Sequence, residues 1–184
     1  VACLPGTLQE ILLRERPGRA GLSPEKDVTL VRVDFFDMGT ALAQGAIDAF
    51  LSGEPFPSMA VAQGYGRILA YPYYDDSVGT INGAMLVTRE LIEKHPQTVQ
   101  TLVNAHARAT EAVRLDRSRW LERAQTLGTP RAVLEQAAAN IELSWRMDAA
   151  FVNQAKALGA RMQALGVIER QPDYDQLFDL RFVE

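Results

Sequence analysis

The sequence contains one cysteine, Cys3, and two histidines, His95 and His106. A single cysteine excludes an intrachain disulfide, and we expect Cys3 to be a buried structural thiol because it lies in an apolar run. Neither histidine has a second histidine or cysteine at zinc-site spacing, so we expect His95 in a surface turn and His106 in the core. No nucleophile-elbow, phosphate-loop or dinucleotide-binding pattern follows a predicted strand. The sequence therefore predicts no metal, no cofactor and no catalytic residue.

Long apolar runs and runs of one charge are also lacking. The 184 residues carry a formal net charge of −4, and no apolar segment approaches the ~18 residues that a membrane span requires. The arginines between residues 108 and 123 alternate with Glu111, Asp116 and Glu122, which is typical of a solvated helix face. We therefore expect no nucleic-acid partner and no direct membrane span.

Strand-like and helical patterns alternate over the first part of the chain. The β-rich segments lie at residues 1–4, 28–33, 47–51 and 67–71, with helical segments between them. This alternation predicts an α/β fold with a mostly parallel sheet. Within it we expect Asp37 and Ser58 to begin two of the covering helices.

The pattern changes near residue 80. One further strand is predicted at residues 84–87, and helices follow it to near the end of the chain. Those helices need a sheet to cover, and this chain supplies only one strand for it. Either the helices form a bundle, or other strands of the same lobe precede Val1.

The helix after residues 1–4 has features of a binding site. Thr7 and Glu10 have the spacing of a capping box, which leaves the amides of Leu8 and Gln9 unpaired. Ligands of open α/β sheets bind beyond the carboxyl ends of strands, and a helix start favours an anion there. An ordinary capped helix has the same pattern, so both interpretations stay open.

A second loop, at Glu54-Pro55, follows the predicted strand at residues 47–51. It also lies at the carboxyl end of a strand, so we expect it to face the same crevice. The alternative is a rigid strand-to-helix corner that carries a surface glutamate. Six aromatic residues near strand ends offer stacking to a ring, although we expect most of them in the core: Phe35, Phe36, Phe56, Tyr71, Tyr73 and Tyr74.

Several short motifs occur in order along the chain: Leu4-Pro5-Gly6-Thr7, Gly21-Leu22, Asp27-Val28, Asp37-Met38, Gly45-Ala46-Ile47-Asp48-Ala49-Phe50 and Glu54-Pro55. Residues 85–96 then combine a strand, a short helix and the pair His95-Pro96, and residues 175–182 form a characteristic ending. This order resembles solute-binding proteins of the nitrate, sulfonate and taurine type, a family that also includes thiamine-precursor binders.

The resemblance implies a type II periplasmic-binding-protein fold, in which two α/β lobes with mostly parallel sheets close on a ligand. By this comparison, residues 1–78 form the second lobe and residues 79–184 the C-terminal, mostly helical part of the first lobe. The family's N-terminal strands and helices of the first lobe have no counterpart here, so we expect a fragment. The resemblance also implies the ligand-binding residues, which are Gly6, Thr7, Leu8, Gly53, Glu54, Pro55 and, as a hinge candidate, Asn82.

The implied function is the exported, periplasmic solute-binding component of an ABC uptake transporter. Its partners would be a small ligand of the nitrate, sulfonate or taurine kind and a membrane permease, and it would not be an enzyme. A pyrimidine-precursor synthase of the same fold needs a reactive lysine or histidine, whereas Lys26, Lys94 and Lys156 are predicted on turns or helices. The effector-sensing domain of a transcription regulator is the other alternative.

Overall fold

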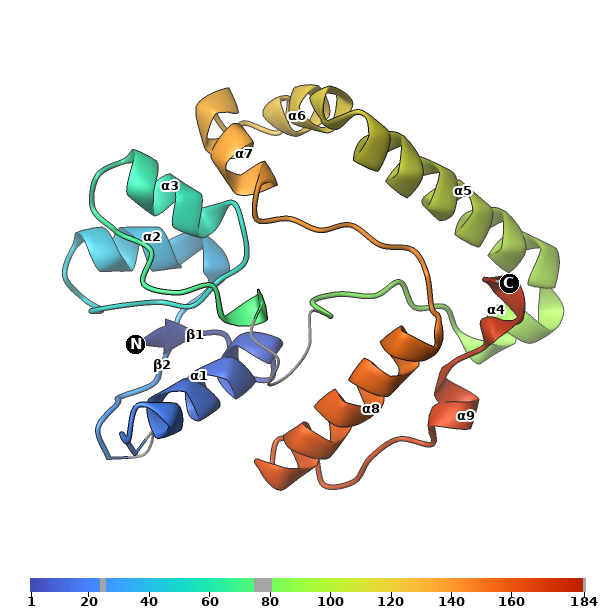
Figure 1. Cartoon of the computed structure of the whole chain (residues 1–184), viewed down its shortest axis with the longest axis horizontal. Coiled ribbons are helices and arrows are strands. Elements are labelled where there is room, and N and C mark those ends of the chain that lie inside the picture. Colours follow the sequence, from blue (N-terminus) through green and yellow to red (C-terminus); the bar gives the residue numbers. More distant parts are fainter. Residues whose placement is uncertain (24–25, 75–80, 184) are drawn as a thin grey trace. The chain divides into compact units, whose positions relative to one another are not determined.

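A computed structural model describes residues 1–23, 26–74 and 81–183. The chain divides into two compact units (Figure 1). The first unit comprises Val1–Asp75 and Arg123–Ile141, and the second comprises Asp76–Glu122 and Glu142–Glu184. The first unit therefore combines most of the predicted second lobe with residues 123–141, which belong to the predicted first lobe. The assignment of lobes stays a prediction.

A small parallel sheet forms the centre of the first unit. Strand β1 (Ala2–Cys3) pairs in parallel with β2 (Val31–Arg32), with Ala2 opposite Val31. On its other side Ala2 forms an isolated parallel bridge with Phe50, through hydrogen bonds to the carbonyl of Ala49 (2.8 Å) and from the amide of Leu51 (3.1 Å). Three of the predicted strand segments thus lie side by side in parallel, as the alternating pattern predicted.

Four helices and a 3₁₀ turn accompany this sheet: α1 (Leu8–Arg19), α2 (Phe35–Ala43), α3 (Phe56–Ala62), η1 (Pro72–Tyr74) and α7 (Arg131–Ala138). Asp34, not Asp37, begins α2, because its carboxylate accepts a hydrogen bond from the Phe36 amide at 3.2 Å. Likewise Pro55 precedes α3, whereas Ser58 is buried within it. Both predicted caps were wrong by about one turn, and in each helix the residue at the N-cap position precedes the phenylalanine that opens the helix.

The core of the first unit joins the sheet to its helices. Ala2, Met38 and Ile47 are buried together, and the partly buried residues around them are Val33, Phe35, Ala41, Leu42 and Phe50. Helix α7 contacts α3 and buries four apolar residues, Val133, Leu134, Ala137 and Ala138. This buried face explains why residues 123–141 belong to the first unit.

The second unit is helical in its described part. It contains α4 (Arg89–Lys94), α5 (Pro96–Leu115), most of α6 (Arg117–Gln125), α8 (Ala149–Ala164), α9 (Tyr174–Leu177) and η2 (Leu180–Phe182). Thr88 caps α4 by accepting from the Leu91 amide at 3.2 Å, and Asp148 caps α8 by accepting from the Phe151 amide at 3.0 Å. None of the described helices is long and apolar enough to cross a membrane.

Two predicted strands are absent from the described residues. Residues 67–71 and 84–87 have no strand assignment, and the side chains of Leu69 and Leu86 are 74% and 82% exposed. A strand exists only through pairing with another, and neither segment has a neighbour in a ladder here. His106 is also exposed rather than in the core, whereas His95 is exposed as expected.

Candidate functional site

The three parallel segments of the first unit end at the same edge of the sheet. Strands β1 and β2 and the segment at Phe50 are parallel, so the chain leaves the sheet at this edge after each of them. Neighbouring strands lie about 4.8 Å apart, so the three segments that follow start close together. The N-terminal ends of α1, α2 and α3 lie on the same side of the unit (Figure 1). This carboxyl edge brings together the two loops proposed from the sequence, residues 5–8 and residues 53–55.

The start of α1 is capped differently from the predicted capping box. The Thr7 hydroxyl donates to the carbonyl of Leu4 at 2.5 Å, and the Gly6 amide donates to Glu10 Oε2 at 2.8 Å. The amide of Gly6 is therefore already paired. The amides of Leu8 and Gln9 donate no hydrogen bond within the described part of the chain, which leaves them directed out of the helix start.

Glu10 places a fixed negative charge beside these amides. The hydrogen bond from the Gly6 amide, aided by Arg14, lowers the pKa of the Glu10 carboxyl, and desolvation opposes this shift only in part. Arg14 donates to Glu10 Oε1 from Nε at 3.0 Å and from Nη2 at 2.6 Å. The arginine compensates the carboxylate, so the helix start can still attract an anion to the amides of Leu8 and Gln9.

Glu54 directs its carboxylate toward its own unit. Oε2 accepts from the Ser58 amide at 3.3 Å, and Oε1 accepts from Asn140 Nδ2 at 2.8 Å. The Glu54–Pro55 peptide bond is cis, and Gly53, Glu54 and Pro55 are half-buried. Both carboxylate oxygens therefore have partners within the protein, a feature the sequence alone did not indicate.

Sequence reasoning missed Asp34 and Ser52 at the same edge. Asp34 caps α2, and Ser52 is 6% exposed, with a hydroxyl that has no hydrogen-bond partner among the described residues. The Tyr73 hydroxyl of η1 is likewise buried without a partner in the described part, and burial raises its pKa to about 12. In the sequence, the position of Ser52 directly before the predicted loop residue Gly53 was the one signal that pointed to Ser52.

Three phenylalanine rings meet where α2 and α3 begin. The rings of Phe35 and Phe56 are stacked with centroids 6.3 Å apart, and Phe36 meets Phe56 edge-on at 5.5 Å. Phe35 packs against the core, whereas Phe36 is 82% exposed. The carboxyl edge therefore offers an apolar ring surface in addition to polar backbone groups.

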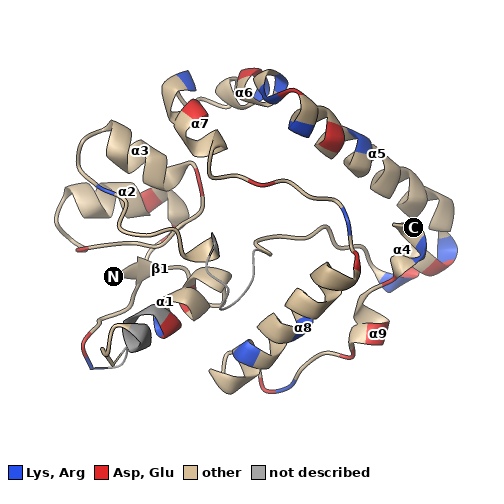
Figure 2. Ribbon diagram, in the orientation of Figure 1, with Lys and Arg blue, Asp and Glu red and all other residues tan. Residues whose placement is uncertain are grey.

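The other predicted features lie outside these two loops. Asn82 is exposed and belongs to the second unit, so its role at a crossing stays a prediction. Cys3 is 2% exposed, and burial raises the pKa of its thiol, as expected for a structural residue. Among the described residues no group of three or more histidine, cysteine or acidic side chains is placed to hold a metal ion. Basic and acidic residues are interspersed along α5 and α6 (Figure 2).

Comparison with known proteins gives three findings. The model of the NMT1-like family matches residues 2–128. Two proteins named nitrate import ATP-binding protein NrtC, from Synechocystis sp. and Synechococcus elongatus, are each 33% identical over 107 residues, which is 58% of this chain and 16% of each relative. The periplasmic aliphatic sulphonate binding protein SsuA from Escherichia coli matches with a TM-score of 0.73 and 22% identity, over 97% of this chain and 57% of that chain.

These findings confirm the resemblance seen in the sequence and the periplasmic-binding-protein fold. The likeness to SsuA, at 22% identity, concerns the fold. The chain spans about one sixth of the length of the NrtC relatives and 57% of the solved structure.

Proposed function

Because the chain belongs to the NMT1-like family, we propose that it is the solute-binding part of an ABC uptake transporter. It holds a small anion of the sulfonate or nitrate kind and does not change it chemically. The observation that carries this proposal is the carboxyl edge of the first unit, where the amides of Leu8 and Gln9 have no partner in the described part of the chain. Backbone amides at a helix start bind anions without any charged side chain.

The predicted residues of the first unit support this proposal by their positions in the chain. Gly6 has a φ of +76° and space around its Cα, so a solute can approach the backbone closely there. Thr7 and Leu8 begin α1, which follows β1. Gly53 and Pro55 follow the segment at Phe50, which pairs with β1 on the side opposite to β2. The exposed ring of Phe36 would cover an apolar part of the solute.

The partners and the location follow the family and belong to the same proposal. The relatives' names refer to nitrate import and to ATP binding, and SsuA is named as a periplasmic protein. We therefore propose that this chain is exported to the periplasm and that its partner there is a membrane permease. Hinge closure around the solute would then signal its presence to the permease.

The chemistry of the edge favours binding over catalysis. Lys94 pairs with Glu90 on the exposed surface of α4, and Lys156 lies over the Tyr174 ring in the second unit. His95 and His106 are also in the second unit and exposed. Lys26 of the first unit is exposed in the turn between α1 and β2, where its amide donates to the carbonyl of Ser23 at 3.1 Å. The described part of the first unit contains no histidine that could act as the base of a pyrimidine-precursor synthase.

Thermal unfolding of the full-length protein with ethanesulfonate, taurine or nitrate tests the proposal. A bound anion at a hundred times its Kd stabilises the folded state by ~2.7 kcal/mol. We expect one of the anions to raise the Tm in proportion to the logarithm of its concentration, with chloride at equal ionic strength as the control. No shift with any of them, together with turnover of a pyridoxal-type substrate, would support the enzyme instead.

A further inference from the structure

The loop at residues 53–55 leaves the sheet next to the loop that leads into α1. Ala2 bridges to Phe50 in parallel. Glu54 lies four positions beyond Phe50, and Gly6 lies four positions beyond Ala2. Because parallel neighbours are about 4.8 Å apart, an unrestrained glutamate side chain at this point of the loop can reach toward the helix start where we place the anion. Its negative charge would repel an anion there, since the Debye length is about 10 Å at 0.1 M salt.

Two hydrogen bonds restrain the Glu54 carboxylate within the first unit. Asn140 Nδ2 donates to Oε1 at 2.8 Å, and the Ser58 amide donates to Oε2 at 3.3 Å. The shorter of the two bonds comes from Asn140, which lies 86 residues away in sequence. Hydrogen bonds to a charged acceptor are stronger than those between neutral groups. Asn140 is therefore the main restraint on the position of this carboxylate.

The packing of α7 fixes the position of Asn140. Helix α7 buries four apolar residues and contacts α3. The Asn140 amide donates to the carbonyl of Ala137 at 2.9 Å, which continues α7, and Ala137 is fully buried. The side-chain donor of Asn140 is thus carried by packed backbone of the same unit as Glu54.

The two carboxylates near the start of α1 differ in how their charge is compensated. Arg14 Nη2 lies 2.6 Å from Glu10 Oε1, so a cation offsets the charge of Glu10. The partners of Glu54 given above are a side-chain amide and a backbone amide, which carry no charge. The effect of Glu54 on a nearby anion therefore depends on where these two donors hold its carboxylate.

We infer that Asn140 is a positioning residue of the solute site, which keeps the Glu54 carboxylate on α3 and α7 and so withholds it from the anion. In this view Glu54 does not contact the solute, and its charge becomes harmful to anion binding when the Asn140 side chain is removed. The inference rests on the proposed function, because it takes the amides of Leu8 and Gln9 as the place of the anion.

Titration calorimetry of the full-length protein with ethanesulfonate and with taurine tests this role. In Asn140→Ala the carboxylate loses its main restraint. We expect the Kd of ethanesulfonate to rise about three- to tenfold, the effect of a like charge at ~4 Å in bulk water. The Kd of taurine should rise less, because its ammonium group can pair with the released carboxylate. Relative to the wild-type protein at the same salt, the rise for ethanesulfonate should shrink at about 1 M salt, where the Debye length is about 3 Å.

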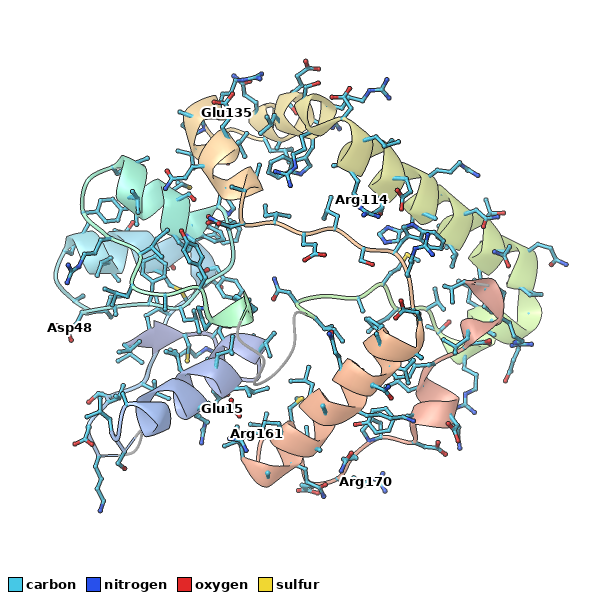
Figure 3. The ribbon with its side chains drawn as sticks, viewed as in Figure 1. Glu15, Asp48, Arg114, Glu135, Arg161 and Arg170 are labelled. Carbon is cyan, nitrogen blue, oxygen red and sulfur yellow. The ribbon has the colours of Figure 1, made fainter. Side chains whose placement is uncertain are left out.

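A second substitution separates the charge of Glu54 from a packing defect. Adding Glu54→Gln to Asn140→Ala removes the released charge, so we expect the ethanesulfonate affinity to return, whereas a packing defect at the end of α7 would persist. Asn140→Ser is too short to reach Glu54 and gives the same test should the alanine variant not fold. Glu135→Gln is the control for net charge and leaves the Kd at the wild-type value, because Glu135 lies on α7 (Figure 3) and pairs on the exposed surface with Arg131.

The outcomes for this role and for the proposed function are distinct. Wild-type ethanesulfonate affinity in a folded Asn140→Ala or Asn140→Ser protein overturns the positioning role alone, and so does a loss that Glu54→Gln does not reverse. A wild-type protein that binds none of ethanesulfonate, taurine and nitrate contradicts the proposed function, and the positioning role falls with it.

Discussion

The first unit buries apolar side chains from its sheet and from each of α1, α2, α3 and α7, whereas the described part of the second unit buries few. Among the described residues of the second unit, the buried hydrophobic side chains are those of Val99 and Leu121. Its distant segments are linked by polar bonds, such as the one from Gln100 Nε2 to the carbonyl of Phe182 at 3.0 Å. Apolar burial contributes roughly 25 cal/mol per Å², whereas a single hydrogen bond adds about 1 kcal/mol net. Substitutions are therefore expected to be more costly in the first unit.

Met38→Ala should give the largest effect. The Met38 side chain is fully buried against Ala2 and Ile47, and truncating such a side chain lowers the free energy of unfolding by about 2–5 kcal/mol. Denaturant unfolding of the full-length protein measures it. The matched control is Leu115→Ala in the second unit, where the side chain is 87% exposed and the expected change is within ~0.5 kcal/mol. Equal losses in the two variants would show that burial of the side chain does not set the cost of truncation.

Gly159→Ala tests whether the second unit has a tightly packed point of its own. A Cβ at Gly159 would overlap the hydroxyl oxygen of Tyr174, whose ring stacks on Phe178 with centroids 6.2 Å apart. Overpacking of this kind costs about 1–3 kcal/mol. We expect faster hydrogen exchange in α8 and α9 and unchanged exchange in β1.

Tyr174→Phe provides the control for that prediction. Removing the hydroxyl makes room for the new methyl group, so the double variant should regain most of the stability lost in Gly159→Ala. A loss that persists in the double variant would show that the methyl group is not tolerated for another reason, such as the remaining ring carbons near Gly159.

The sequence predicted the local features of the first unit better than its distant ones. The parallel segments and the helix after Gly6 were predictable because a strand period, a turn and a cap occur within ten residues. The cap of α2 was assigned to Asp37 although Asp34 forms it. Two aspartates one turn apart have the same local capping signal. The packing of Phe35 against the core decides that the helix begins after Asp34.

The misses elsewhere involve partners far along the chain. Helices were predicted after residues 84–87, but the place of α7 against α3 depends on contacts between residues more than sixty positions apart in sequence. Glu54 was expected at the ligand edge, and its partner Asn140 lies 86 residues away. Residues 67–71 and 84–87 have apolar strand-like composition, yet strand formation requires a neighbouring strand that periodicity does not reveal. The periodicity of the sequence thus predicted most helices and strands. The hydrogen-bond partners of side chains and the pairing of strands are seen only in the structure.

The smallest expected effect compares two ion pairs of identical spacing, one in each unit. Glu10 and Arg14 are 2.6 Å apart with side chains 14% and 36% exposed, whereas Glu90 and Lys94 are 2.8 Å apart with side chains 72% and 65% exposed. Water and salt screen the exposed pair, so Lys94→Met should change the free energy of unfolding by less than ~0.5 kcal/mol. Arg14→Met should cost more, up to ~1 kcal/mol, because Glu10 would stay ionised beside the Gly6 amide with less compensation. The loss of unfolding free energy should persist at high salt for Arg14→Met and vanish for Lys94→Met. A larger loss for Lys94→Met than for Arg14→Met would mean that burial does not set the strength of these pairs.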